Sequence, residues 1–306
     1  MKIRIATRKS RLAIWQAEHV ASLLRSHGAD VELVPMTTAG DRHLETRLDK
    51  IGGKGLFIKE LEVAMAERRA DIAVHSMKDV PANMPVEFVI AAVLEREDSA
   101  DVLVSNSYDS LDDLPQAARV GTSSIRRQTQ ILHTRPDLDV LSLRGNVDTR
   151  LKKLDDGEFD AIVLAAAGLK RLGLSDRITQ RFRREDSLPA IGQGLIGIEC
   201  RGDDTETIEL LEQLDNPVSR IVLTAERAVG RHLNADCQAP VAAHARASNT
   251  RVFIDALVAA PGGRQILRDR DEGPDFDAEA VGERLAKRLI ERGAQSLLAA
   301  WDPAGG

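Results

Sequence analysis

Aromatic residues and cysteines are both scarce in this chain of 306 residues: Phe, Trp and Tyr make up 3%, and there are two cysteines. The cores must therefore be built from Leu, Ile, Val and Ala. Two cysteines in a chain of this length do not form a disulfide framework, which favours a reducing compartment. No apolar run is long enough to span a membrane, and basic residues stand at the N-terminus where a signal peptide needs an apolar run. We therefore expect a cytoplasmic protein, or an organellar one if the chain is a processed form.

Signatures of several common activities are missing as well. The segment Gly53-Lys54-Gly55 lacks the Ser/Thr and the spacing of a P-loop, and no G-x-G-x-x-G follows a strand. Two distant cysteines and seven scattered histidines give no metal-ligand spacing. There is no G-x-S-x-G turn of a serine hydrolase. A net charge of −6 argues against a nucleic-acid-binding protein. We expect neither nucleotide nor metal nor nucleic acid as a ligand.

The composition is that of an ordinary globular protein, 43% hydrophobic and 29% charged, and the length suggests two or three domains. Short apolar strands alternate with helical patterns, which is typical of a parallel sheet covered by helices. The expected strands are 3–6, 31–34, 71–74, 102–104, 119–121, 140–143, 161–165 and 195–200, and expected helices include 12–23, 56–69, 147–154, 168–172 and 205–214. Beyond Asn216-Pro217 a helix (219–231), strands 241–247, 252–259 and 265–270, and a helix (278–292) predict a smaller α+β unit.

Basic residues gather where the predicted strands end and helices begin. The clusters are Arg8, Lys9 and Arg11; Lys50, Lys54 and Lys59; Arg126 and Arg127 after Gly121-Thr122-Ser123-Ser124; and Arg144 and Arg150. One such cluster alone is more often a solvated face. Several at strand-to-helix turns favour a site for an anionic ligand, because guanidinium groups and helix N-termini both bind carboxylates or phosphates. Ligands of such α/β sheets bind beyond the carboxyl ends of the strands. The ligand should carry many negative charges.

Three further residues are candidates for chemistry. Asp79 follows a strand end and precedes Val80-Pro81; it is either a turn or ion-pair residue, or an ionised carboxylate that stabilises a cationic intermediate and transfers protons. Cys200 lies in a strand-like run and is predicted to be structural. Cys237 lies in a polar loop, where a thiol is a candidate for covalent chemistry.

These segments together resemble the hydroxymethylbilane synthase (porphobilinogen deaminase) family. The matching runs are R-I-A-T-R (4–8), G-G-K-G-L-F (52–57), E-L-E-V-A (60–64), D-I-A-V-H-S-M-K-D-V-P (71–81), G-T-S-S-I-R-R-Q (121–128), L-R-G-N-V-D-T-R (143–150), D-A-I-V-L-A-A-A-G-L-K-R-L (160–172), L-P-A-I-G-Q-G (188–194) and T-A-E-R (224–227). The resemblance covers residues 3–245 and weakens in the remaining C-terminal part. The runs 75–81 and 143–150 are its most specific parts.

The resemblance implies an α/β fold with two doubly wound domains like those of type II periplasmic binding proteins, and a smaller α+β C-terminal domain. The expected boundaries are 1–97 with 195–214, then 98–194, then 217–306. It also implies a dipyrromethane cofactor, attached through a thioether to Cys237, and a catalytic role for Asp79. By position, the resemblance assigns cofactor contacts to Lys78, Thr122, Ser123, Ser124, Arg126, Arg127, Arg144 and Gln193, and substrate contacts to Arg8, Lys54, Arg150 and Arg171.

The activity implied by the resemblance is a transferase reaction of porphyrin and haem biosynthesis: four porphobilinogen molecules are joined head to tail with loss of ammonia, and water releases linear hydroxymethylbilane. We expect a monomer whose partner is the small-molecule substrate. One alternative is an anion-binding protein or sensor that shares only the fold, and it needs neither Asp79 nor Cys237. Another is an inactive paralogue, against which the intact Asp79, Cys237 and arginines argue.

Overall fold

The computed structural model describes residues 1–38, 58–235 and 239–301. The chain divides into two compact units, each made of two stretches of sequence. Unit 1 comprises Met1–Glu97 and Leu195–Arg220, and unit 2 comprises Asp98–Gly194 and Ile221–Gly306. Each unit has its own sheets and its own buried core, and is described by itself below.

The sheet of unit 1 has the strand order β2-β1-β3-β10-β4. Its strands are β1 (Lys2–Arg8), β2 (Asp30–Met36), β3 (Ile72–Ser76), β4 (Phe88–Val93) and β10 (Ile196–Arg201). β1 pairs in parallel with β2 and β3, whereas β10 runs antiparallel to both β3 and β4. A strand from a distant part of the sequence therefore lies in the middle of this sheet.

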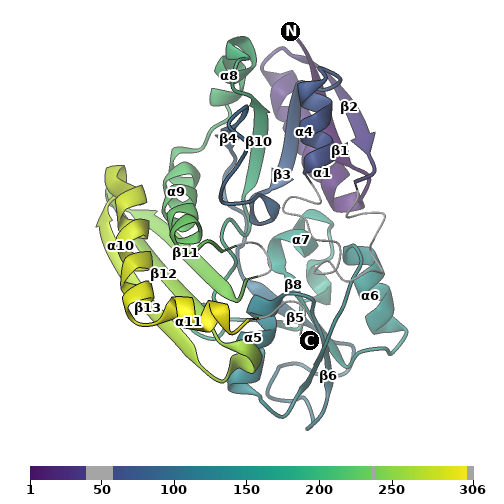
Figure 1. Cartoon of the computed structure of the whole chain (residues 1–306). Coiled ribbons are helices and arrows are strands. Elements are labelled where there is room, and N and C mark those ends of the chain that lie inside the picture. The colour runs from purple at the N-terminus through teal and green to yellow at the C-terminus, as the bar shows by residue number, and fades with distance from the viewer. Residues whose placement is uncertain (39–57, 236–238, 302–306) are drawn as a thin grey trace. The chain divides into compact units, whose positions relative to one another are not determined.

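Helices cover both faces of this sheet (Figure 1). They are α1 (Arg11–Ser26), α4 (Lys59–Ala66) and α8 (Thr205–Glu212). The first core cluster includes Ile3, Ile5, Val20 and Leu211, and a second one includes Met65. Strands that are covered on both faces are expected to be apolar along their length, as residues 72–74 are.

Helix α1 shows how the sequence sets an element boundary. The Ser10 side chain accepts a hydrogen bond from the Ala13 backbone N–H at 3.3 Å, which satisfies one of the unpaired donors of the first turn. The helix ends before Gly28, whose φ of +83° suits a residue without a side chain. Between these ends the buried side chains recur on one face, among them Ala17, Val20 and Leu24.

Unit 2 contains a sheet of the same design, with the order β7-β6-β8-β5-β9. Its strands are β5 (Asp101–Val104), β6 (Arg119–Gly121), β7 (Asp139–Leu141), β8 (Ala161–Ala165) and β9 (Gln180–Arg181). β6 is parallel to β7 and β8, and β5 is antiparallel to β8 and β9. The accompanying helices are α5 (Ile125–Thr134), α6 (Val147–Asp155) and α7 (Ala166–Arg171). Separate clusters of buried residues lie on its two faces.

The second sheet of unit 2 is antiparallel, with the order β11-β12-β13. Its strands are β11 (Val241–Ser248), β12 (Arg251–Ala259) and β13 (Ile266–Pro274). Helix α10 (Ala278–Glu291) packs along β12 and β13, and α9 (Pro217–His232) and α11 (Ala294–Ala299) complete the region (Figure 1). A Cβ at Gly282 would lie 2.2 Å from the Ala225 carbonyl oxygen, so glycine permits the close crossing of α9 and α10.

The expected fold class is confirmed: two doubly wound α/β sheets and a smaller α+β part. One expectation was wrong in part, because each doubly wound sheet is mixed rather than parallel. The helix expected over 56–69 is observed at Lys59–Ala66, and β4 and α11 were not anticipated. The domain boundaries given above stay a prediction. Within the described ranges, no helix combines the length and apolar character needed to cross a membrane.

A close contact beneath the Asp79 turn yields the first prediction. A Cβ at Gly197 on β10 would lie 2.1 Å from the Met77 Sδ, and Met77 is buried. We expect Gly197→Ala to lower the free energy of unfolding by about 1–3 kcal/mol through overpacking. Gly202→Ala is the control, because the nearest atoms to its Cβ would lie at 3.6 Å. Equal urea midpoints for the two variants would show that Met77 accommodates the added methyl group.

Candidate functional site: two basic strand edges

Thr122, Ser123 and Ser124 follow strand β6 directly, at the edge of the unit 2 sheet where the neighbouring parallel strand β7 also ends. The Ser123 hydroxyl donates a hydrogen bond to the Leu143 carbonyl oxygen at 2.7 Å. This contact connects the two turns and brings the backbone beside Arg144 next to the β6 turn. Parallel pairing therefore brings together two of the segments that sequence reasoning selected.

Helix α5 begins at this edge. Ser124 is its N-cap residue but makes no side-chain capping bond, and the first turn contains no acidic residue. Its own N–H donates to the Thr122 hydroxyl at 3.1 Å. A helix N-terminus without an internal anion is a favourable place for the carboxylate of a ligand.

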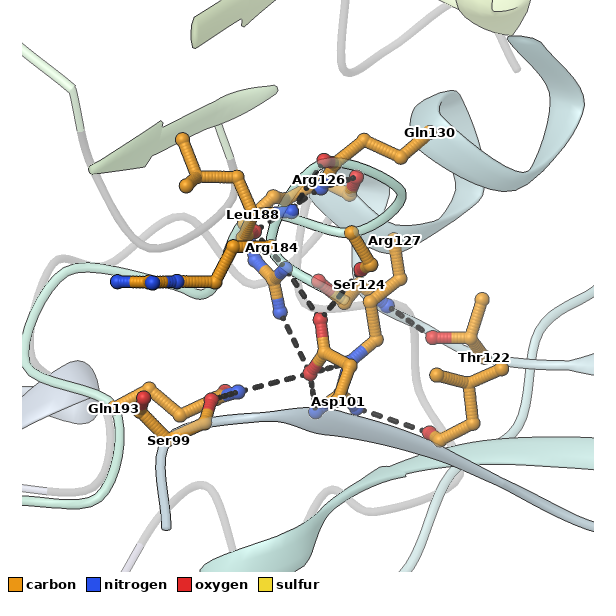
Figure 2. Close-up of polar contacts among 12 residues, drawn as sticks. Ser99, Asp101, Thr122, Ser124, Arg126, Arg127, Gln130, Arg184, Leu188 and Gln193 are labelled. Atoms are coloured by element: carbon orange, nitrogen blue, oxygen red, sulfur yellow. Dashed lines mark hydrogen bonds and ion pairs between the residues drawn. The ribbon is translucent and has the colours of Figure 1, made fainter. Parts of the chain in front are cut away.

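The guanidinium groups of Arg126 and Arg127, in the first turn of α5, are bound to the carboxylate of Asp101 (Figure 2). Arg126 Nη1 lies 2.6 Å from Asp101 Oδ2, and its Nη2 lies 3.2 Å from Oδ1. Arg127 Nε donates to the same Oδ1 at 2.9 Å. The guanidinium groups also donate to the carbonyl oxygens of Leu188 and Val163, at 2.6 and 3.0 Å. Both arginine side chains are buried, so this cluster is not a solvated face.

Two residues of the segment before β10 bind the same carboxylate. Ser187 Oγ donates to Asp101 Oδ2 at 2.9 Å, and Gln193 Nε2 donates to Oδ1 at 2.9 Å and to the Ser99 carbonyl oxygen at 2.8 Å. Burial alone would raise the pKa of Asp101. The charges of Arg126 and Arg127, with the hydrogen bonds, outweigh burial and hold the pKa of this carboxyl far below its usual range. Asp101 is therefore an anion throughout the physiological pH range.

The remaining predicted arginines of unit 2 are half-buried. Arg150 Nε donates to the Gly145 carbonyl oxygen at 2.8 Å, and Arg171 Nη2 donates to the Gly194 carbonyl oxygen at 2.8 Å. Arg144 lies in the turn after β7. Backbone carbonyls therefore help to fix the position of two of these guanidinium groups.

In unit 1, the corresponding sheet edge carries Arg8, Lys78 and Asp79. Arg8 is the last residue of β1, and Lys78 and Asp79 lie in the short 3₁₀ helix η1 (Met77–Asp79) that follows the parallel strand β3. All three side chains are half-buried. A carboxylate and two cations thus lie at one edge of the sheet of unit 1. The sequence pattern predicted that such residues lie where strands end.

His75 belongs to the most specific run of the sequence, yet its side chain is directed into the sheet core. Its Nε2 lies 2.7 Å from Glu199 Oε2 on β10, and both side chains are buried. Burial, together with the nearby Glu199 charge, raises the pKa of Glu62 on α4. These residues form an internal polar group that sequence reasoning missed, because the pairing of β3 with β10 is not visible in local spacing.

Cys200 has the structural character that the sequence predicted. It is completely buried in β10, and burial raises the pKa of its thiol to about 12, so it is a poor nucleophile. Cys237 and Lys54 lie outside the described residues. Their assignments stay predictions.

The sheet topology and the basic edges define a class: a mixed α/β protein that binds anionic ligands beyond the carboxyl ends of its parallel strands. Residues 3–209 match the family model for the dipyromethane cofactor binding domain of porphobilinogen deaminase, and residues 221–291 match the model for its C-terminal domain. The chain belongs to the porphobilinogen deaminase family. Its function is that of a hydroxymethylbilane synthase, a transferase of tetrapyrrole biosynthesis that uses porphobilinogen and a dipyrromethane cofactor. The expected family, activity and cofactor are thus confirmed.

Solved structures that are similar to this chain come from binding proteins. The methionine-binding protein MetQ is 14% identical over 70% of this chain and 89% of that chain, with a TM-score of 0.46. A nutrient-binding protein from Burkholderia cenocepacia, bound to methionine, is 14% identical over 68% and 89%, with a TM-score of 0.43. A periplasmic domain of BvgS from Bordetella pertussis is 16% identical over 70% and 86%, with a TM-score of 0.41.

The donors at the unit 2 edge fit a cofactor that carries carboxylates. Arg126 Nε is buried and has no hydrogen-bond acceptor among the described residues. Burying such a donor unpaired costs free energy, and a ligand carboxylate would satisfy it. The uncapped start of α5 offers backbone N–H groups to the same kind of ligand.

The Asp101 cluster predicts how stability depends on pH. The unfolded Asp101 carboxyl titrates near ~3.9, whereas the folded one stays ionised well below that value, so its contribution is fully present above pH ~4 and is lost as the pH falls. At pH 7 we expect Asp101→Asn to lower the free energy of unfolding by about 3–5 kcal/mol. The difference from wild type should shrink by up to ~1.4 kcal/mol per pH unit below pH 4. Urea unfolding of wild type and Asp101→Asn at pH 7, 4 and 3 measures this difference in the free energy of unfolding. A difference that does not change with pH would contradict the ion triad.

Proposed function

We propose that this chain builds hydroxymethylbilane by stepwise head-to-tail condensation of four porphobilinogen units, with loss of ammonia at each step, on a dipyrromethane attached to Cys237. The observation that carries the proposal is the arginine pair of α5, held in place by Asp101 at an uncapped helix N-terminus. Each pyrrole unit brings two carboxylates, so a growing product needs fixed cations along its length. Water releases the finished product.

The cofactor is assigned to the residues grouped around the β6 and β7 turns. In unit 2 these are Thr122, Ser123, Ser124, Arg126, Arg127, Arg144 and Gln193. Lys78, in η1 of unit 1, is assigned to the cofactor by the family resemblance. When bound, the dipyrromethane supplies the free α-carbon from which the chain starts. The arginines hold its acetate and propionate groups, the helix N-terminus adds N–H donors, and the hydroxyl groups position the turns.

Arg8, Lys54, Arg150 and Arg171 are assigned to substrate and to the growing product. Support comes from the placement of Arg8 at the end of β1, and from the backbone contacts that fix Arg150 and Arg171. A guanidinium that is already positioned loses less conformational entropy when it binds a carboxylate. Such cations orient incoming substrate and neutralise the charge that each addition brings.

Asp79 is assigned the catalytic role. Loss of ammonia from porphobilinogen leaves a cation on the substrate, and a fixed carboxylate stabilises that charge as it develops. The same carboxylate then accepts the proton that leaves the newly joined pyrrole carbon. Asp79 is held for this task as the last residue of η1, which begins at buried Met77 and is followed by buried Val80.

A simple anion-binding protein without catalytic activity is the competing function. It would use the arginines but would need neither a carboxylate among the cations nor a cofactor-bearing thiol. Asp79 beside Lys78 at the end of β3 favours the enzyme.

We also propose that the protein is a cytoplasmic monomer without nucleic-acid or membrane partners. Light scattering would test the oligomeric state, and cell fractionation would test the location.

The attachment residue yields a prediction that mass spectrometry decides. The purified protein should be heavier than its sequence by one dipyrromethane, and acidic Ehrlich's reagent should colour it. Cys237→Ala should lose both signals, because the thioether cannot form. Cys200→Ala is the matched control and should keep them, since its thiol is buried with a pKa of about 12. An adduct on Cys200, or active protein without an adduct, would refute the assignment.

A second prediction concerns the charge of Asp79. Asp79→Asn keeps the shape of the side chain but removes the negative charge, so kcat should fall by ~10²–10³ while the unfolding midpoint stays near that of wild type. Asp79→Glu should retain part of the activity because it keeps the charge in a displaced position. Turnover by Asp79→Asn at the wild-type rate would leave this residue a role in the turn alone.

A further inference from the structure

Three of the buried side chains assigned to the cofactor share one hydrogen-bond acceptor, and that acceptor was not among the assigned residues. Arg126, Arg127 and Gln193 all donate to the carboxylate of Asp101. We propose that Asp101 is a positioning residue of the cofactor site: it fixes both guanidinium groups and the amide in the arrangement that receives the carboxylates of dipyrromethane. This inference rests on the proposed cofactor assignment.

The place of Asp101 in the sheet suits this role. It is the first residue of β5, which runs antiparallel to β8, and Asp101 pairs with Ala165 at the carboxyl end of β8. Its carboxylate therefore lies at the same sheet edge as the turn after β6. A side chain on a central strand moves less than one on a loop, so it is a rigid support for the first turn of α5.

Asp101 also decides which donors of Arg126 remain for a ligand. Both Nη1 hydrogens are used, one on Asp101 Oδ2 and one on the Leu188 carbonyl oxygen, and Nη2 gives one hydrogen to Oδ1. Nε has no acceptor among the described residues. The Nε hydrogen and the second Nη2 hydrogen lie on one edge of the planar group, the pair that a carboxylate accepts bidentately. Asp101 thus holds Arg126 by one edge and leaves the other as a carboxylate receptor.

Arg127 and Gln193 are fixed by the same carboxylate from other directions. Arg127 is also tied to the Val163 carbonyl oxygen on β8, and Gln193 to the Ser99 carbonyl oxygen just before β5. Without the anion, two buried guanidinium groups would repel each other and turn apart. Asp101 keeps them side by side and leaves the pair with one net positive charge.

The experiment measures cofactor uptake by folded apo-protein, with no need for turnover. Wild type, Asp101→Asn, Ser187→Ala and Asp160→Asn are produced without porphobilinogen, and their folded fraction and melting temperature are measured by circular dichroism. Porphobilinogen is then added, and intact mass follows the conversion of apo-protein to holo-protein. Asp160→Asn is the matched control: its carboxylate binds Arg119 in the same unit, through Oδ1 to Nη2 at 3.1 Å, and does not contact the cluster.

We expect folded Asp101→Asn to acquire the cofactor ~10–100-fold more slowly than wild type, because displaced guanidinium groups no longer match the ligand. Asp160→Asn should acquire it at the wild-type rate even if its melting temperature falls. Uptake by Asp101→Asn at the wild-type rate, or equal slowing in Asp160→Asn, would limit Asp101 to stabilising the fold.

Ser187→Ala keeps the test decisive if Asp101→Asn does not fold. It removes one of the hydrogen bonds that orient the Asp101 carboxylate, so the carboxylate and the guanidinium groups bound to it should shift while all three charges are kept. Slower uptake with an unchanged melting temperature supports the positioning role, and uptake at the wild-type rate overturns it. Wild-type protein that gains no dipyrromethane would instead refute the cofactor assignment itself.

Discussion

At the start of helix α5, the guanidinium groups of Arg126 and Arg127 form ion pairs with the carboxylate of Asp101, and all three are nearly excluded from water. The arrangement of the basic edge of unit 2 depends on this ion triad. The side chains of Arg126 and Arg127 are 5% and 6% exposed, and that of Asp101 is fully buried. A buried cation without a partner is strongly unfavourable, so neither arginine could remain inside without the aspartate. The same bonds reach the segment before β10 through Ser187 and Gln193. One side chain therefore connects a strand, a helix and a loop.

Hydrogen bonds that fix arginine side chains within the protein favour binding of a ligand whose negative charge increases with each addition. A flexible arginine can follow any anion, but it loses conformational entropy at each encounter. Arg150 and Arg171 each donate to a backbone carbonyl oxygen, which helps to orient the guanidinium group. Arg126 and Arg127 share one anion and so keep half of their combined charge.

Much of this arrangement could be predicted from the sequence, for identifiable reasons. Strands 119–121 and 161–165 were predicted with their observed bounds, and the second of them is a short apolar run. The placement of Arg8 and Asp79 at strand ends followed from the alternation of strands and helices. Asp101 and Glu199 were missed, because each acts through strands that pair over long separations in sequence. Local spacing carries no information on which strand an isolated acidic residue will face, and the antiparallel places of β5 and β10 were missed for the same reason.

The central position of β10 has a consequence for how the chain folds during synthesis. β3 and β4 do not pair with each other; both pair with β10, which begins more than a hundred residues after β3 ends. The sheet of unit 1 therefore stays incomplete until the ribosome has released residues 196–201, whereas strands β5 to β9 of unit 2 are contiguous in sequence and can pair earlier. Domains generally fold in the order of their synthesis, and pairing over long separations is slow. The sheet that begins first in the sequence is therefore completed after the β5–β9 sheet of unit 2, and until then β3 and β4 have unpaired edges that a chaperone could protect.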